Sequence, residues 1–420
     1  MSEKYSAEMI FQPKSYPVYT YVDRSLGNST YEKRMKRAIR TPGNLVVVSG
    51  ASKSGKTVLC HRVVAEHEIV DLSGSQIREA DDFWEQIAEK LELPTEIQIT
   101  ENEGVSAKTS TKGEGKVSVG ISAGLSRQTE KEHTAGNSIA KKSLRNNTQM
   151  MRSLIQEDKV LVIDDFHYIE PEVQQYIART LKTELFHGLK AVILTLPHRS
   201  DDAIRLNPDL IGRTTVIDIA PWSLDELKKI AEKGFALLSF PITPDDIETL
   251  ARESIASPQL MQENCLSLAE EAKEESASDV TAGLLQRAFA MTATNYEYYK
   301  QPLQAALKGP AQGRKQRKKY ALDQGQHVDG YKLLLLSISK DPPELSFSVE
   351  EIKQRILDLL ADSPGAALST LYISNIVNHI EKSFQKSLPQ LDTIEWKDKT
   401  LYILDPFLLF YLRWDTDWKG

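Results

Sequence analysis

The eight residues Gly50–Thr57 (GASKSGKT) constrain this 420-residue chain more than any other stretch. They fit the pattern GxxxxGK[ST]. An apolar, β-branched run, Asn44–Ser49 (NLVVVS), precedes them, and a segment from Gly55 to about Glu66 that is typical of a helix follows. A glycine-rich turn between a buried strand and a helix directs backbone N–H groups and the positive helix end at a phosphate. The pattern therefore predicts a nucleotide-phosphate site in an α/β protein.

Each part of this loop has a predicted role. Its backbone amides surround the phosphates, the Lys56 ammonium reaches the β- and γ-phosphates, and the Thr57 hydroxyl is a ligand of Mg²⁺. We therefore predict ATP and Mg²⁺ as the cofactors. The predicted binding residues of the loop are Gly50, Ala51, Ser52, Lys53, Ser54, Gly55, Lys56 and Thr57.

A second acidic site follows the apolar run Val160–Ile163. Here Asp164 is predicted to hold the Mg²⁺ shell, and Asp165 to orient the attacking water. A turn at a strand end also favours aspartate. Asp164 and Asp165 therefore indicate a nucleotide site only in combination with the phosphate loop. His167, two residues later, is expected to pack or hydrogen-bond locally.

Two further residues have two interpretations each. Thr195 closes the predicted strand Ala191–Thr195, where its hydroxyl could sense the γ-phosphate or could simply end the strand. Arg213 precedes the predicted strand Thr215–Ile219, where it could reach a neighbouring subunit's nucleotide as an arginine finger or form a surface salt bridge. Arg205 is the second candidate for the finger.

Strands and helices alternate through the first half of the chain. Continuous apolar strands separated by helices indicate a parallel sheet covered on both faces. From Ser223 to about Tyr299 only helices are predicted, and the last ninety or so residues read as a small domain of helices with a short hairpin. The further predicted strands are 68–72 and 159–164, and the predicted helices of this half are 81–91 and 172–183.

Two basic segments interrupt this organisation. Residues 104–145 carry eight Lys or Arg against three Glu and are predicted as a flexible hairpin or loop inserted into the core. The insertion is either a solvated loop or a surface that meets nucleic acid or a neighbouring subunit. The linker GPAQGRKQRKK (309–319) could grip phosphates through its cations or could be solvated; the cations are Arg314, Lys315, Arg317, Lys318 and Lys319.

Charge and composition narrow the class of protein. The net charge of −7 argues against a globally basic nucleic-acid binder. The two cysteines, Cys60 and Cys265, are far apart and predict no disulfide framework, which suits a reducing cytoplasm. No apolar run approaches the roughly 20 residues of a spanning helix. We expect a cytoplasmic protein with no membrane partner.

Together these residues resemble the AAA+ and STAND classes of P-loop ATPase, in particular the origin-recognition-like prokaryotic group. The resemblance implies a central sheet in 5-1-4-3-2 order, a helical lid from Ser223 and a C-terminal winged helix. It also implies that Val22 and Arg24 lie near the adenine. The matching segments are YVDR (21–24), SGASKSGKT (49–57), VLVIDDFHYI (160–169), GRTTVIDIAPWSLDEL (212–227) and ILDPFLLFYLRW (403–414).

Two departures from the AAA+ pattern bear on activity. Asp165 stands where AAA+ proteins commonly carry glutamate, and its shorter side chain predicts slow hydrolysis. The segment Ser257–Leu260 (SPQL) keeps a proline but lacks the sensor arginine of AAA+ relatives, which favours the STAND side. On that side, nucleotide holds a conformation instead of driving continuous work.

These features predict five segments and two competing functions, with ATP binding without turnover as a third possibility. Residues 329–420 carry ten Lys or Arg against fourteen Asp or Glu, so protein contacts are favoured over DNA for this domain. The predicted segments are an N-terminal extension (1–40), an ATPase core (41–221), a helical lid (222–308), a basic linker (309–328) and the winged-helix-like domain (329–420).

The leading hypothesis is an ATP-binding and ATP-hydrolysing regulatory switch that changes conformation or forms a homo-oligomer. It would signal to an effector or regulatory partner protein, and the resemblance suggests prokaryotic anti-phage defence as the setting. The alternative is an ATP-dependent AAA+ protein that loads onto DNA or regulates transposition, with the basic insertion and linker on the DNA backbone.

Overall fold

The fold is that of a computed structural model, which describes the following residues of the chain: 5–93, 96–100, 103–108, 130–132, 139–143, 147–196, 210, 212–308, 316–323, 325–361, 368–389 and 391–419. Between residues 96 and 143 only the backbone is described. The chain forms two compact units. We call Ser25–Gly50 with Lys56–Ile219 the sheet unit, and Met1–Arg24 with Ala51–Gly55 and Ala220–Gly420 the helical unit.

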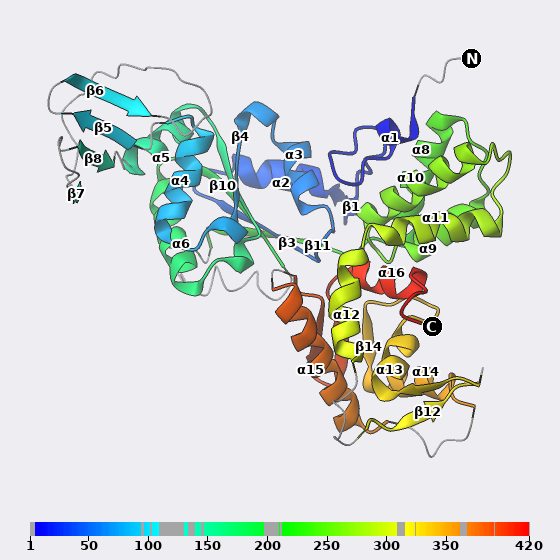
Figure 1. Ribbon diagram of the computed structural model, residues 1–420. Coiled ribbons are helices and arrows are strands. Elements are labelled where there is room, and N and C mark those ends of the chain that lie inside the picture. The colour runs from blue at the N-terminus through cyan, green and yellow to red at the C-terminus, as the bar shows by residue number, and fades with distance from the viewer. Residues whose placement is uncertain are drawn as a thin grey trace. The chain divides into compact units, whose positions relative to one another are not determined.

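A five-stranded parallel sheet organises the sheet unit (Figure 1). The strands lie in the order β11-β3-β10-β9-β4, which is 5-1-4-3-2 when they are numbered along the chain, so the predicted order is confirmed. The strands are β3 (Leu45–Gly50), β4 (Ile69–Ser73), β9 (Val160–Asp164), β10 (Lys190–Thr195) and β11 (Thr214–Ile219). The first and last residues of each strand lie within two residues of the predicted ones.

Helices cover both faces of this sheet, because neighbouring residues of the buried strands point to opposite sides. Val47 packs with α4, α5 and α6, whereas Val46 and Val48 pack with α2 and α3. The helices of the unit are α2 (Tyr31–Arg40), α3 (Lys56–Val63), α4 (Ala80–Lys90), α5 (Asn147–Gln156) and α6 (Pro171–Phe186), with 3₁₀ turns η1 (Glu66–Glu68), η2 (Gly74–Gln76) and η3 (Phe166–Tyr168). A short hairpin, β1 (Ser25–Leu26) with β2 (Ser29–Thr30), precedes α2.

The basic insertion contains more strand than the sequence predicted. Four antiparallel strands pair in the order β6-β5-β8-β7. They are β5 (Glu96–Thr100), β6 (Glu103–Lys108), β7 (Glu130–Glu132) and β8 (Ile139–Ser143), so the sheet begins before the predicted boundary at 104. The alternating run 116–126 lies outside the described residues. Helix α5, which follows, was not among the predicted elements.

The helical unit has one continuous apolar core that joins both ends of the chain. Ile10, Phe11 and Val22 of the N-terminal segment pack with the lid helices and with the C-terminal helices. The N-terminal and lid helices are α1 (Ala7–Ile10), α8 (Leu224–Leu238), α9 (Pro244–Glu253), α10 (Pro258–Glu274), α11 (Ala282–Thr294) and α12 (Lys300–Leu307), with η5 (Glu297–Tyr299) before α12. Capping boxes at Ser223 and Thr243 fix the starts of α8 and α9.

The C-terminal elements follow the order helix, strand, helix, helix, strand, strand, and a final helix closes them. The three strands form an antiparallel sheet, β14-β16-β15. The elements are α13 (Gly330–Ile338), β14 (Ser346–Ser348), α14 (Val349–Leu357), α15 (Thr370–Ser387), β15 (Ile394–Lys397), β16 (Thr400–Ile403) and α16 (Pro406–Trp414). Helix α16 is buried from Pro406 to Leu412, as expected of a core segment.

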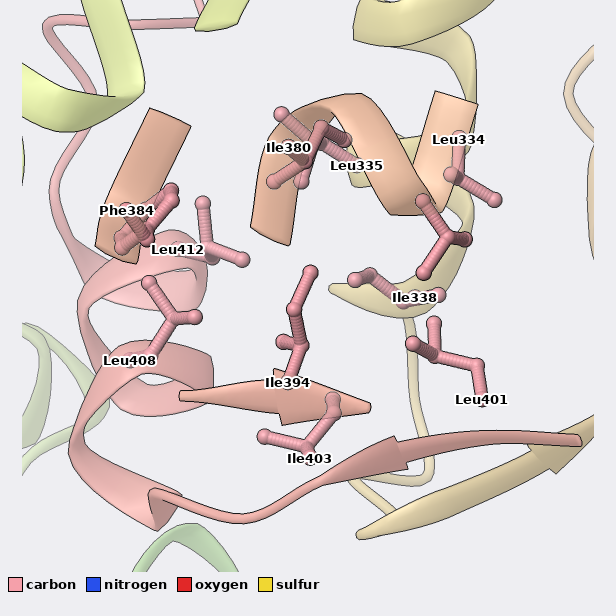
Figure 2. A pocket seen from close by; sticks show the side chains of 11 residues that line it. Leu334, Leu335, Ile338, Ile380, Phe384, Ile394, Leu401, Ile403, Leu408 and Leu412 are labelled. Carbon is pink, nitrogen blue, oxygen red and sulfur yellow. The ribbon is translucent and has the colours of Figure 1, made fainter. Parts of the chain in front are cut away.

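Figure 2 shows the interior of this C-terminal region, where aliphatic side chains of α13, α15, α16 and the strands converge. Leu335, Ile380, Ile394 and Leu408 line a gap of about 10 Å³. A gap of that size holds at most one water, and its lining is apolar, so it is part of the packed core.

Part of the predicted basic linker is folded. A hairpin of β12 (Lys319–Ala321) and β13 (His327–Asp329) occupies it. Arg317 donates from Nη1 to Asp329 Oδ2 at 2.9 Å, and its guanidinium lies 3.5 Å from the centre of the Tyr331 ring. Because its side chain is only 15% exposed, Arg317 supports the fold rather than offering a free cation. Within the described residues, no helix has the length and apolar character needed to cross a membrane.

Candidate nucleotide site

The phosphate loop joins β3 to α3 and depends on unusual backbone angles. Gly55 has φ of 91° and Lys53 has φ of 61°, both in the left-handed region. Glycine adopts that region without steric cost, whereas lysine does so at some cost, which is common at ligand sites. The turn ends at Lys56, the first residue of α3, so the helix N-terminus opens at the loop as the sequence predicted.

The Lys56 side chain is buried at the base of the loop. Its Nζ donates to the carbonyl of Gly50 at 3.0 Å. Lys56 is 8% exposed, a degree of burial that is uncommon for lysine unless the ammonium is paired. The ammonium is therefore held beside the residues whose amides are predicted to bind phosphate.

Thr57 and Asp164 meet although 107 residues separate them. Thr57 Oγ1 donates to Asp164 Oδ2 at 2.6 Å, and the backbone N–H of Asp165 donates to Asp164 Oδ1 at 2.8 Å. A hydroxyl and a carboxylate are oxygen ligands of the kind that Mg²⁺ prefers, and Thr57 is exposed. No group of three or more His, Cys, Asp or Glu side chains suited to a metal occurs in the described part of the chain. The Thr57–Asp164 pair fits a Mg²⁺ that is also held by nucleotide phosphates.

Asp165 has a left-handed backbone, with φ of 53° and ψ of 35°. Its carbonyl accepts a hydrogen bond from Tyr168 N at 3.0 Å, which starts the turn η3. Aspartate visits this region more readily than most residues. The turn directs the chain away from the sheet immediately after the predicted metal ligand.

Thr195 has a buried hydroxyl with no hydrogen-bond partner among the described residues. It ends β10, where it pairs in register with Ser49 of β3, one residue before the phosphate loop. The residue is 1% exposed, and its Oγ1 is unsatisfied. Burying a hydroxyl without a partner is costly. An oxygen of a bound ligand would relieve that cost.

Of the two candidate arginine fingers, Arg213 lies among the described residues. Arg213 is exposed, and its side chain makes no hydrogen bond or ion pair with the residues that the structure describes. The surface salt bridge considered from the sequence is therefore not formed within the described residues. Arg205 lies outside them.

Val22 and Arg24 lie in the helical unit. Val22 is 4% exposed and part of the core. Arg24 Nη2 donates to the carbonyls of Ala220 at 2.8 Å and Pro221 at 3.1 Å, and Arg24 Nε lies 3.1 Å from Glu226 Oε1. Burial alone would raise the pKa of Glu226, but hydrogen bonds from Arg24 and from the Ser223 backbone lower it below its usual value. The guanidinium of Arg24 is thus fixed by four groups of its own unit, including the Trp222 ring at 4.5 Å.

Two residues near this machinery were missed from the sequence. Trp222 Nε1 donates to the carbonyl of Ser54 at 2.9 Å and so holds the phosphate loop by its backbone. The only sequence feature that could have drawn attention to Trp222 is the tryptophan itself within APWSLDEL (220–227). Gly74, directly after β4, lies against the backbone of Asp164 and Asp165. A glycine after a strand is too common to have indicated this.

Cys60 lies in α3, close to the site, and is fully buried. Burial, with the negative charge of Asp164 nearby, raises the pKa of its thiol well above the usual range. A protonated, buried thiol is neither a nucleophile nor a metal ligand. Cys265 is buried and free as well, so neither cysteine forms the disulfide that the sequence also argued against.

Residues 39–201 match the AAA domain family. That span holds the phosphate loop, Asp164, Asp165 and Thr195, and the match supports assignment of this part to the AAA class of P-loop ATPase, which uses nucleotide and typically Mg²⁺. The chain is also similar to RuvB-like helicase 1 of Candida albicans, with 27% identity over 105 residues. The match covers 23% of this chain and 23% of that relative's length.

Three solved structures are among those to which the chain is similar. Cdc6p from Pyrobaculum aerophilum is 13% identical at a TM-score of 0.44, with 96% of both chains covered. A Walker-type ATPase of Pyrococcus abyssi is 13% identical at a TM-score of 0.47, with 91% of this chain and 94% of that chain covered. The RuvB Holliday junction branch migration motor of Thermotoga maritima is 12% identical at a TM-score of 0.40, with 89% and 90% covered.

Proposed function

We propose that this protein binds ATP with Mg²⁺ and hydrolyses it, and that the nucleotide sets the conformation of a regulatory switch. The observation that carries the proposal is the Thr57–Asp164 contact of 2.6 Å directly beside the loop that holds Lys56. Residues 107 positions apart have no local reason to bring a hydroxyl and a carboxylate together there. A phosphate-bound cation gives a reason.

The residues divide the work as follows. The loop Gly50–Thr57 binds the phosphates through its amides, and Lys56 neutralises their charge. Bound Mg²⁺ would be held by Thr57 and Asp164 and would supply charge neutralisation on the phosphates. Asp165 orients the attacking water, and Thr195 donates its unsatisfied hydroxyl to the γ-phosphate region. Val22 and Arg24 remain our candidates for the adenine side.

Lys56→Ala tests the proposal most directly. We expect ATP binding, measured by calorimetry in the presence of Mg²⁺, to fall by about 100-fold or more because a buried, phosphate-facing charge is lost. Lys36→Ala, an exposed lysine of α2 in the same unit, is the matched control and should bind ATP like the wild type. Unchanged affinity in Lys56→Ala would contradict the site.

Arg213 is our candidate for a finger that acts on a neighbouring copy. Its exposed side chain without an ion pair in the described residues is available for such a contact. Arg213→Ala should retain ATP binding and lose turnover by about 1,000-fold if the active species is an oligomer. Sizing with and without a non-hydrolysable ATP analogue supplies the oligomeric state. A monomer that hydrolyses ATP at full rate without Arg213 would refute the finger.

We further propose that the C-terminal region is a winged helix that contacts protein. Its order of elements and three-stranded sheet suit that fold. Its net charge of −4, from ten Lys or Arg and fourteen Asp or Glu, favours a partner protein over DNA. With the STAND-like SPQL segment, this points to a switch that signals to an effector, and anti-phage defence is our proposed setting.

One observation favours the alternative, an ATP-dependent DNA-binding protein. Helix α15 presents an exposed polar face with base-reading side-chain types at helical spacing: Asn375, Asn378, Lys382, Gln385 and Lys386. Titration with duplex DNA at two salt concentrations separates the two functions. Tight binding with a steep salt dependence supports the alternative, and weak binding at both concentrations supports the protein-directed switch.

A further inference from the structure

We propose that Gly74 is a positioning residue for the Asp164–Asp165 pair, an inference that rests on the proposed ATPase function. The register of the parallel sheet brings the two segments together. Ser73, the last residue of β4, pairs with Asp164, the last residue of β9. Gly74 directly follows β4 and Asp165 directly follows β9, so these two residues lie side by side at the edge of the sheet.

The contact at Gly74 leaves no room for a side chain. A Cβ atom built on Gly74 would lie 2.5 Å from the Asp165 carbonyl oxygen, 2.7 Å from the Asp164 carbonyl oxygen and 2.8 Å from the Asp165 carbonyl carbon. These are backbone atoms of a strand end, which cannot rotate away as the tip of a side chain can. Any residue other than glycine must displace the backbone at Asp164 and Asp165.

Backbone conformation does not explain this glycine. Gly74 does not have a positive φ, so alanine could adopt its backbone angles without strain. The requirement is purely one of space. That separates Gly74 from Gly55 of the phosphate loop, where the torsion angle itself favours glycine.

Gly74 contacts the two peptide groups on either side of the Asp165 Cα, and this backbone orients both carboxylates. Asp165 is held in its left-handed conformation by its N–H bond to Asp164 Oδ1 and by the bond from Tyr168 N to its carbonyl. Moving either carbonyl would rotate the peptide and shift Asp164 Oδ2 away from Thr57. The position of β4 therefore affects the position of Asp164 Oδ2 through the contact between Gly74 and the backbone of Asp164 and Asp165.

A second residue holds the β4 side of this contact. Gln86 of α4 accepts a hydrogen bond from Ser73 N at 2.8 Å and donates to the Ser73 carbonyl at 3.2 Å. Gln86 is therefore bonded to both backbone groups of the residue that precedes Gly74. Replacing it loosens the same contact without adding any atom at Gly74.

Gly74→Ala tests the inference. We expect kcat for phosphate release to fall about 10- to 100-fold because a misplacement on the ångström scale suffices for that loss. The Mg²⁺ concentration for half-maximal ATP binding should rise about 10-fold or more, as it does when support of a metal ligand is lost. ATP affinity in EDTA should stay at the wild-type value, since the phosphate loop is untouched. A purely structural role would not shift the Mg²⁺ requirement alone.

Two variants complete the experiment. Gly283→Ala in α11 is the matched control, because a Cβ there meets nothing closer than Arg287 Nη1 at 3.5 Å; it should behave as wild type. Gln86→Leu should change the Mg²⁺ requirement in the same direction as Gly74→Ala but less, and it decides the matter if Gly74→Ala does not fold.

The outcomes separate this inference from the proposed function. Wild-type Mg²⁺ dependence and kcat in Gly74→Ala overturn the inference alone, as does an unchanged Gln86→Leu when the alanine variant does not fold. A wild-type protein that shows no Mg²⁺-dependent ATP binding overturns the proposed function instead.

Discussion

Two buried polar sites, the Glu253–Arg413 pair of the helical unit and Thr195 of the sheet unit, differ in their hydrogen bonding. In the helical unit, Arg413 donates to both carboxylate oxygens of Glu253, at 2.7 and 3.0 Å, and to the carbonyl of Ser339 at 2.7 Å. Trp414 Nε1 adds a bond to Glu253 Oε2 at 2.8 Å. In the sheet unit, the equally buried Thr195 hydroxyl has no partner among the described residues.

We interpret this difference as one between a structural network and a proposed ligand site. A buried charge must be fully paired to be tolerated, and the Glu253–Arg413 pair meets that demand between α9 and α16. An unpaired buried hydroxyl lowers stability, and we propose that at Thr195 a bound ligand completes its bonding. We therefore expect substitutions in the Glu253–Arg413 network to change the free energy of unfolding, and substitutions at the proposed nucleotide site to change the rate of ATP turnover.

Breaking the hydrogen-bond network of Glu253 and Arg413 should have the largest effect of these substitutions. Arg413→Ala leaves the Glu253 carboxylate buried without its cation, so the free energy of unfolding should fall by about 3–5 kcal/mol. Urea unfolding followed by tryptophan fluorescence measures it. Arg287→Ala is the control, because Arg287 is 47% exposed and its pair with Glu275 should contribute about 1 kcal/mol or less. Equal losses in the two variants would contradict the comparison.

The second-largest effect should come from removing the Asp165 charge, which we propose orients the attacking water. In Asp165→Asn the backbone turn can persist because asparagine also tolerates the left-handed region. Phosphate release should fall about 100-fold, which corresponds to about 2.7 kcal/mol of barrier. ATP binding should be retained. If wild type and variant release phosphate at equal rates, Asp165 has no part in the chemistry.

The smallest effect should come from Thr195→Val, which replaces the hydroxyl by a methyl group of similar size. Phosphate release should fall about 10-fold, or about 1.4 kcal/mol of barrier. The free energy of unfolding should stay within about 0.5 kcal/mol of the wild type, because no hydrogen bond is lost.

Thr292→Val is the matched partner of that experiment. Thr292 is also fully buried, but its Oγ1 donates to Ser267 Oγ at 2.9 Å. Its loss should lower the free energy of unfolding by about 1–2 kcal/mol and leave phosphate release unchanged. A Thr195→Val variant that destabilises the fold as much as Thr292→Val would show that Thr195 has a structural partner instead of a ligand.

Local patterns predicted the elements that bear the site. The apolar runs of β3, β9 and β10 are contiguous signals, and these strands are confirmed. The 5-1-4-3-2 order, which only the family resemblance implied, is confirmed as well. The AAA class is supported by the match over residues 39–201. The roles of the site residues, the domain boundaries and the winged helix stay predictions.

Contacts between distant residues could not be predicted in this way. Gly74 and Trp222 each act on a backbone far away in sequence, at Asp165 and Ser54, and no spacing rule links them. The linker cation Arg317 looked available because its partners Asp329 and Tyr331 follow only after a hairpin. The insertion was predicted as a hairpin or loop, and its four strands were not predicted individually.

The N-terminal segment of the helical unit has a consequence for how the protein is made. Gln12 N donates to Gln262 Oε1 across 250 residues, and the Phe11 ring fills the space where Gly234 has no side chain. At ribosomal speeds of about 5–20 residues per second, Ile10, Phe11 and Gln12 must wait roughly 12 to 50 s for these partners to be synthesised. During that interval Ile10 and Phe11 have no native surface to cover them. Nascent chains should therefore bind hold-type chaperones through the segment around Ile10 and Phe11.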